Sequence, residues 1–131
     1  MDIVFLDASV LFAAGYRPRA KCLKLWELPE VRLITSTYAA DEAARNLSEV
    51  EQRTRLADLM RSVELMGTHI GDPLPAGIDL PAKDAPILQA AIAAKATHLL
   101  TSDMKHFGRY FWQIVEGVTI LPPAAYLKGK S

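Results

Sequence analysis

The sequence predicts an α/β protein, a three-layer α/β/α sandwich around a mostly parallel central sheet of 4-5 strands. Short apolar runs, such as residues 3–6 and 98–101, are typical of strands that are covered on both faces. Stretches with apolar residues at helical spacing separate these runs. Strands that alternate with helices indicate βαβ units, which build a parallel sheet through right-handed crossovers.

The chain has the size and composition of one folded domain. Its 131 residues suffice for one core but not for two, so we expect a single domain over residues 1–131. Lys plus Arg and Asp plus Glu each number 15, so the net charge neither supports nor excludes a nucleic-acid partner. The one cysteine, Cys22, excludes an internal disulfide and suits a reducing compartment.

The N-terminus does not have the pattern of a signal peptide. Asp2 directly follows Met1, and the apolar run over residues 3–6 is much shorter than a signal-peptide core. No stretch approaches the roughly 18 apolar residues of a membrane span. We therefore expect a cytoplasmic protein with no membrane partner.

The first half of the chain alternates apolar runs with amphipathic stretches. Gly15 interrupts the first helical stretch, and Pro29 ends the second. Ser36 or Thr37 has the chemistry of an N-cap for the helix that begins near Tyr38. The expected elements are a strand over 3–6, helices over 10–14 and 20–28, a strand over 32–36, a helix with its apolar stripe over 40–50, and a helix with its stripe over 56–66 that Gly67 ends.

The second half begins with a loop that is rich in proline and glycine. After it, Asp84 is followed by Ala-Pro, and proline suits the first turn of a helix. The expected elements are a brief strand over 68–70, a loop over 71–81, a helix that Asp84 opens, a strand over 98–101, a short aromatic-rich helix over 108–113, a strand over 117–121 and a short basic tail from residue 126.

Four acidic residues from distant segments are predicted to meet at one edge of the sheet. Asp7 and Asp103 follow the ends of two strands, and Asp84 opens a crossover helix on the same side. Glu42 faces this edge from the helix after the second strand, although helical spacing does not separate it from Asp41. Acids brought together raise one another's pKa unless a cation neutralises them. Carboxylate oxygens suit Mg²⁺ or Mn²⁺, and without clusters of His and Cys a zinc site is not expected.

Each acid also has a structural explanation. Asp84 and Asp103 stand where helix N-caps are expected, and a Glu on a helix, such as Glu42, is usually just solvated. Asp7 is harder to explain this way, because it lies directly against a buried strand and precedes an apolar helix. The metal-site hypothesis therefore depends on the four acids together.

Four segments, taken together, resemble the PIN domain, a family of small α/β/α metal-dependent nucleases. The segments are residues 5–9 (FLDAS), 42–47 (EAARNL), 83–91 (KDAPILQAA) and 96–103 (ATHLLTSD). They span nearly the whole chain in the order and spacing of the family. The resemblance implies a PIN-like fold and favours Glu42 over Asp41. The residues that it implies as metal-binding and catalytic acids are Asp7, Glu42, Asp84 and Asp103, with Ser9 and Thr101 as hydroxyl support in the pocket.

The resemblance also implies the reaction and the partners. It implies a Mg²⁺- or Mn²⁺-dependent endoribonuclease that hydrolyses RNA to 5′-phosphate and 3′-hydroxyl ends. The family includes the VapC-like toxins, which a small antitoxin protein holds inactive, and nucleases of RNA processing. A toxin of a toxin–antitoxin pair and a homodimer are therefore expected. The alternative is a PIN-like domain without turnover that acts as an RNA- or protein-binding module.

Two parts of the site depart from the family's pattern. Ser9 stands where Asn is common, and Lys105 and His106 occupy the region where many members carry a further acid. A solvated loop is the alternative for His106, whereas His69 and His98 are expected as core or edge residues rather than as ligands. Basic side chains near the site would contact RNA phosphates. The residues expected to do so are Lys105, His106, Arg17, Arg19, Lys83 and Arg109.

Overall fold

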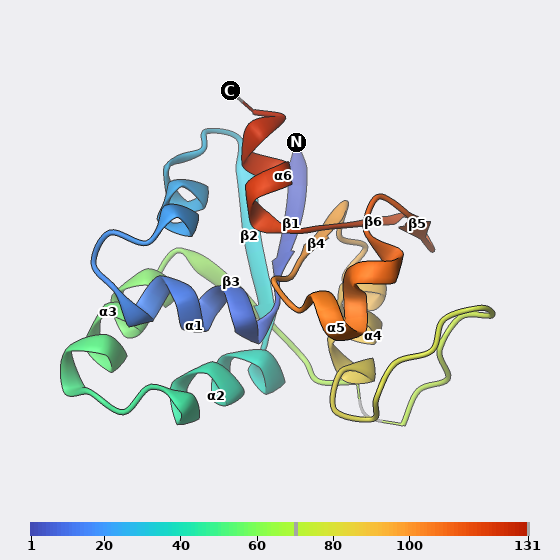
Figure 1. Cartoon of the computed structure of the whole chain (residues 1–131), viewed down its shortest axis with the longest axis horizontal. Helices are drawn as coiled ribbons and strands as arrows, with labels where there is room; N and C mark the ends of the chain where they lie inside the picture. Colours follow the sequence, from blue (N-terminus) through green and yellow to red (C-terminus); the bar gives the residue numbers. More distant parts are fainter. Residues whose placement is uncertain (70, 131) are drawn as a thin grey trace.

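A mostly parallel central sheet flanked by helices forms the protein, as the sequence predicts. The computed structural model describes residues 1–69 and 71–130. Within this part of the chain, α1, α2 and α3 lie on one side of β1 and β2, and α4 and α5 lie on the other (Figure 1). The helices are α1 Ala8–Tyr16, α2 Thr37–Asn46, α3 Val50–Met60, α4 Ala85–Ala93, α5 Met104–Phe107 and α6 Pro123–Lys128, with 3₁₀ turns η1 Lys21–Glu27 and η2 Gly108–Tyr110.

The sheet has six strands in the described residues, in the order β3-β2-β1-β4-β6-β5. Five of them are parallel, and β5 pairs antiparallel with β6. The expectation of four to five strands is therefore too low. The apolar residues of β3 also fit the spacing of the helix before it, and β5 has only two residues. The strands are β1 Asp2–Leu6, β2 Val31–Ser36, β3 Val63–Met66, β4 His98–Leu100, β5 Ile114–Val115 and β6 Val118–Leu121.

The segment after α3 differs most from its prediction. The amphipathic helix ends at Met60 rather than at Gly67, and the apolar residues that follow form β3. Val63 lies opposite Leu33 of β2, so pairing at the sheet edge prevails over apolar spacing that also fits a helix. Thr68 is outside any strand, so the strand expected over 68–70 does not begin there. Residue 70, the last residue of that expected strand, lies outside the described residues.

Helix α1 continues through Gly15 to Tyr16, so the predicted interruption at Gly15 is wrong. A Cβ atom on Gly15 would lie 2.8 Å from Leu47 Cδ1 and 3.2 Å from Leu56 Cβ. The glycine therefore permits the close approach of α1 to α3 rather than ending the helix.

The C-terminal segment is also a helix rather than a basic tail. Tyr126 of α6 is buried, and its hydroxyl donates to Asp2 Oδ2 at 2.6 Å. This bond holds α6 beside the start of β1, at the end of the strand opposite to Asp7. No helix in the part of the chain that the structure describes is both long and apolar enough for a membrane span.

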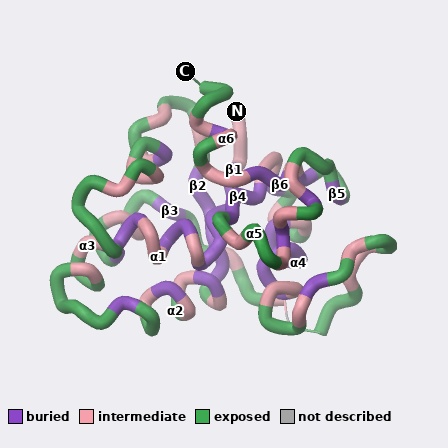
Figure 2. Tube along the Cα trace, in the orientation of Figure 1, coloured by how far each residue is buried: buried purple, intermediate pink, exposed green. Residues whose placement is uncertain are grey.

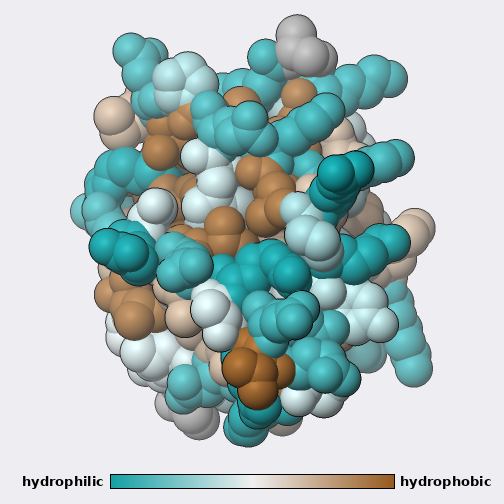
Figure 3. Space-filling view, turned by 90° about the vertical axis from the view of Figure 1, so that its left-hand side faces the viewer, coloured by the Kyte–Doolittle hydropathy of each residue, from teal (hydrophilic) through white to brown (hydrophobic). Residues whose placement is uncertain are grey.

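The core lies where β1 and β4 meet the helices on both sides (Figure 2). Side chains of Phe5, Leu6, Leu99 and Leu100 have no exposed surface, so the chain segments that lead into Asp7 and Asp103 are firmly held. Unlike the core, the outer surface on the side of α1 and α3 is mixed, with hydrophilic side chains around several apolar patches (Figure 3).

Candidate metal centre

Asp7 places a buried carboxylate at the carboxyl end of β1. The residue is 6% exposed, and its Oδ1 accepts a hydrogen bond from Ala8 N at 2.7 Å, which caps α1. Oδ2 accepts from the hydroxyls of Ser9 at 2.9 Å and Thr101 at 2.6 Å. Burial raises the pKa of Asp7, and these hydrogen bonds offset only part of that effect. The folded protein therefore holds a carboxylate in an environment that disfavours its charge.

Thr101 connects Asp7 to the segment that carries Asp103. The side chain of Thr101 is fully buried, and its Oγ1 also accepts a hydrogen bond from Asp103 N at 3.1 Å. Ser9 makes a second connection, since its Oγ accepts from Ser102 N at 3.0 Å. The two residues expected as hydroxyl support thus both contact the Asp7 carboxylate.

Replacing Thr101 with Val should destabilise the protein by about 1–3 kcal/mol, because a buried donor to Asp7 and an acceptor for Asp103 N are lost together. Thr101→Ser is the matched control, since it keeps the hydroxyl and loses only a methyl group. Urea unfolding of the metal-free proteins measures the difference. Equal free energies of unfolding for the Val and Ser variants would contradict the role of the hydroxyl.

Asp84 occupies the N-cap position of α4, but its side chain does not cap the helix. Its carboxylate makes no capping hydrogen bond, and its buried Oδ2 has no hydrogen-bond partner among the described residues. Oδ2 does lie 3.1 Å from His106 Nδ1, in a contact that lacks the geometry of a hydrogen bond. Burial raises the pKa of Asp84, and the charges of Asp103 and Asp7 act in the same direction. The structural explanation of Asp84 as a side-chain cap is therefore wrong.

Asp103 serves as a cap and faces the other acids at the same time. Its Oδ1 accepts from His106 N at 3.1 Å, which caps α5, and its Oδ2 lies 2.8 Å from His106 Nδ1. Burial alone would raise the pKa of Asp103, but the hydrogen bonds and charge of His106 outweigh it, so the net shift is downward. The two interpretations of Asp103, as cap and as ligand, are compatible because each uses a different oxygen.

Three of these side chains form a group with the spacing of metal ligands. One ligand atom each of Asp84, Asp103 and His106 lies within 4.8 Å of the other two. Among the described residues, Asp7 and Glu42 do not belong to this group, although the charge of Asp7 reaches Asp84. The donor set of two carboxylates and one imidazole fits a divalent cation.

Glu42 approaches this edge from α2. It is partly buried, whereas the neighbouring Asp41 is exposed. Tyr38 of the same helix contacts the segment before Asp84, because its hydroxyl donates to Lys83 O at 2.7 Å. Its pKa is raised by burial and by the charges of Glu42 and Asp84. Glu42 and Asp84 thus both act on Tyr38, although Glu42 is not part of the group of ligand atoms among the described residues.

His106 belongs to the group of possible metal ligands, although the sequence analysis does not predict it there. It was expected to contact phosphate or to lie in a solvated loop, but its side chain is only 21% exposed and stands between two carboxylates. The available signal was its position three residues after Asp103, which puts it above Asp103 on the first turn of α5.

The basic residues expected at RNA phosphates lie in three places. Lys83 lies near the acids, since its charge lowers the pKa of Asp103. Lys105 and Arg109 are exposed on and after α5. Arg17 and Arg19 instead line a groove of about 1060 Å³ whose other lining residues include Ser102 and Met104, on either side of Asp103.

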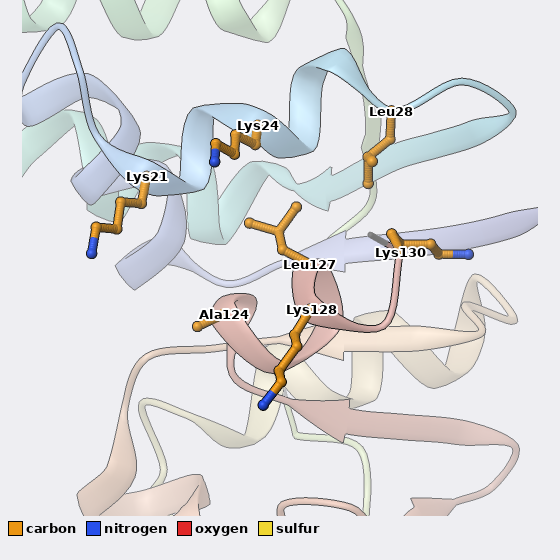
Figure 4. A pocket seen from close by; sticks show the side chains of 7 residues that line it. All are labelled: Lys21, Lys24, Leu28, Ala124, Leu127, Lys128 and Lys130. Carbon is orange, nitrogen blue, oxygen red and sulfur yellow. The ribbon is translucent and has the colours of Figure 1, made fainter.

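This groove continues into a smaller pocket of about 510 Å³ that is rich in lysine (Figure 4). The two share Lys21, Ala124 and Leu127 in their linings. Lys21 and Lys24 extend from η1, whereas Lys130 turns away and lies 2.9 Å from Asp2 Oδ2. Basic side chains therefore follow a surface that leads away from Asp103.

Comparison with known proteins confirms the fold. No family model matches the chain, and no curated protein matches it by sequence. The structure of VapBC-1 from nontypeable Haemophilus influenzae contains a chain with a TM-score of 0.59 and 18% identity, over 93% of this chain and 98% of that one. The structure of VapBC2 from Rickettsia felis, bound to a DNA fragment from their promoter, contains one with a TM-score of 0.64 and 17% identity, over 92% of this chain and 98% of that one. The predicted PIN-like fold is thus shown by structural likeness.

Proposed function

We propose that this protein is a metal-dependent endoribonuclease of the cytoplasm that hydrolyses RNA to 5′-phosphate and 3′-hydroxyl ends. The observation that carries the proposal is the buried Asp84 Oδ2, which has no hydrogen-bond partner among the described residues and faces Asp103 and His106. A buried carboxylate oxygen without a hydrogen-bond partner is unfavourable, and a cation bound between the acids relieves it. A PIN-like fold with acids at this edge supports a nuclease rather than a purely structural role.

The chain's own residues have distinct parts in this function. Asp84 and Asp103 would hold a Mg²⁺ or Mn²⁺ ion, with Asp7 beside them and Glu42 approaching from α2. Thr101 orients the carboxylate of Asp7 through its hydroxyl. A bound divalent ion supplies Lewis-acid activation of water and stabilisation of charge on the phosphate.

The groove beside Asp103 is the path that we propose for the RNA strand. Arg17 and Arg19 line it, and Lys21 and Lys24 line the adjoining pocket. With a formal net charge of zero, the protein needs such a local basic surface to attract a polyanion. Contacts to phosphates position the strand without reading its sequence, so we expect binding to weaken strongly with salt.

We further propose that the protein is the toxin of a toxin–antitoxin pair, that a small antitoxin holds it inactive, and that it acts as a homodimer. The likeness to chains in two VapBC structures, over more than nine-tenths of this chain, supports this role.

The test is cleavage of single-stranded RNA by the purified chain with Mn²⁺ or Mg²⁺. We expect cleavage that stops with a chelator and falls about 10²-fold or more in Asp103→Asn, since a ligand and its charge are lost. Asn remains a good N-cap, so α5 should persist. Asp58→Asn, an exposed acid on α3, is the matched control and should leave cleavage unchanged.

Cleavage that survives Asp103→Asn or the chelator would refute the proposed reaction. Salt-sensitive binding of RNA by the wild-type chain without cleavage in either metal would instead favour a binding module.

A further inference from the structure

His106 holds an imidazole nitrogen between two carboxylates from different elements. Its Nδ1 lies 2.8 Å from Asp103 Oδ2 and 3.1 Å from Asp84 Oδ2. Helix α5 begins directly after Asp103, and the fully buried Phe107 anchors this short helix in the core. The imidazole is therefore positioned by the fold and does not depend on a flexible surface side chain.

Helix capping does not explain this arrangement. A cap at α5 requires only Asp103 Oδ1 and His106 N, and both are used for it. The chain contains a simple pair with the same spacing, in which His69 Nδ1 lies 3.1 Å from Asp72 Oδ2. That pair is exposed and involves one carboxylate, whereas His106 meets a second, buried oxygen from Asp84 that no described residue satisfies by hydrogen bonding.

We propose that His106 is itself a ligand of the ion held by Asp84 and Asp103, and that its nitrogen makes the centre select Mn²⁺ over Mg²⁺. The inference uses the metal centre of the proposed function but does not require turnover. Asp103 caps α5 with Oδ1 and keeps Oδ2 for the ion, so both residues can bind without unwinding the helix. Carboxylates suit Mg²⁺ and Mn²⁺, whereas an imidazole donor favours transition-metal ions.

Pulsed EPR of the full chain with one equivalent of Mn²⁺ tests the ligand directly. We expect modulation from a directly bound ¹⁴N nucleus that changes to the ¹⁵N pattern when the histidines are labelled. The chain has 3 histidines. The double variant His69→Gln/His98→Gln should therefore keep the signal, and His106→Gln should lose it. The double variant assigns the nitrogen even where His106→Gln binds no Mn²⁺.

Calorimetric titration measures the selectivity. We expect His106→Gln to weaken Mn²⁺ binding at least about tenfold and to change Mg²⁺ binding little. His69→Gln, from the exposed pair with the same spacing, is the matched control and should alter neither affinity. Equal losses for the two metals, or no loss, would overturn the selectivity.

The outcomes separate this inference from the proposed nuclease. Bound Mn²⁺ without nitrogen modulation overturns the ligand role and leaves the nuclease proposal standing. Nitrogen-bound Mn²⁺ in a chain that does not cut RNA supports the ligand role and removes the nuclease. A chain that binds no Mn²⁺ at all overturns both.

Discussion

Asp7→Asn should raise the stability of the metal-free protein and reduce its stabilisation by Mn²⁺. The carboxylate of Asp7 is buried with its pKa raised, so a neutral side chain of the same shape relieves an unfavourable charge. The hydroxyls of Ser9 and Thr101 can rotate to suit an amide.

Metal binding to the folded state stabilises the wild type by about 2.7 kcal/mol at 100 times its Kd, and loss of Asp7 weakens that binding. Thermal melts with and without Mn²⁺ measure both effects.

The pH dependence of the metal-free proteins gives an independent check. The folded-state pKa of Asp7 lies above its unfolded value, so the unfolded chain releases this proton first as the pH rises. The wild type therefore loses stability from the unfolded pKa upward through the folded pKa, and Asp7→Asn does not. The two proteins should converge in acid and diverge towards neutral pH. Asp58→Asn, which removes an exposed charge, should show no gain. A metal-free Asp7→Asn protein that is less stable than the wild type at pH 7 would contradict the interpretation.

Phe107→Ala should destabilise the protein by about 3–5 kcal/mol, a large part of the roughly 5–15 kcal/mol typical of a folded domain. Phe107 has no exposed surface and is the core anchor of α5. The substitution leaves a cavity under the helix that carries His106, so the metal ligands should also become less well positioned. Denaturant unfolding measures the stability.

Two further variants test whether the effect is specific to Phe107. Phe107→Leu retains much of the buried volume, so its loss should be clearly smaller and its Mn²⁺ affinity close to that of the wild type. Phe111→Ala, at a partly exposed position in the groove, should also lose less. A loss below about 1 kcal/mol for Phe107→Ala would show that α5 does not depend on this contact.

Much of the fold was predictable because parallel strands that are buried on both faces are continuous apolar runs. The runs that became β1, β2, β4 and β6 have this property and were predicted to within a residue or two. The segment that became β3 is half exposed at the sheet edge, and its spacing also fits the helix before it. The predicted helix interruption at Gly15 fails for a similar reason. In the sequence, a glycine that ends a helix looks the same as one that lets a neighbouring helix pack closely.

The positions of Asp7, Asp84 and Asp103 followed from local patterns. Two of them follow buried strands, and the third precedes a helix with proline in its first turn. The sequence by itself thus determined the α/β class, the order of most elements and the edge at which these acids lie, because hydrophobic periodicity and turn chemistry are local properties.

Only the tertiary structure decided which side chains meet and what each atom does there. Pairing of β1 with β4 brings Thr101 to the carboxylate of Asp7, and the packing of α4 and α5 leaves Asp84 Oδ2 facing His106. These contacts join residues that are 94 and 22 positions apart, a separation over which periodicity carries no information. Their distances depend on strand register and on how far each helix is buried, which are properties of the packed molecule.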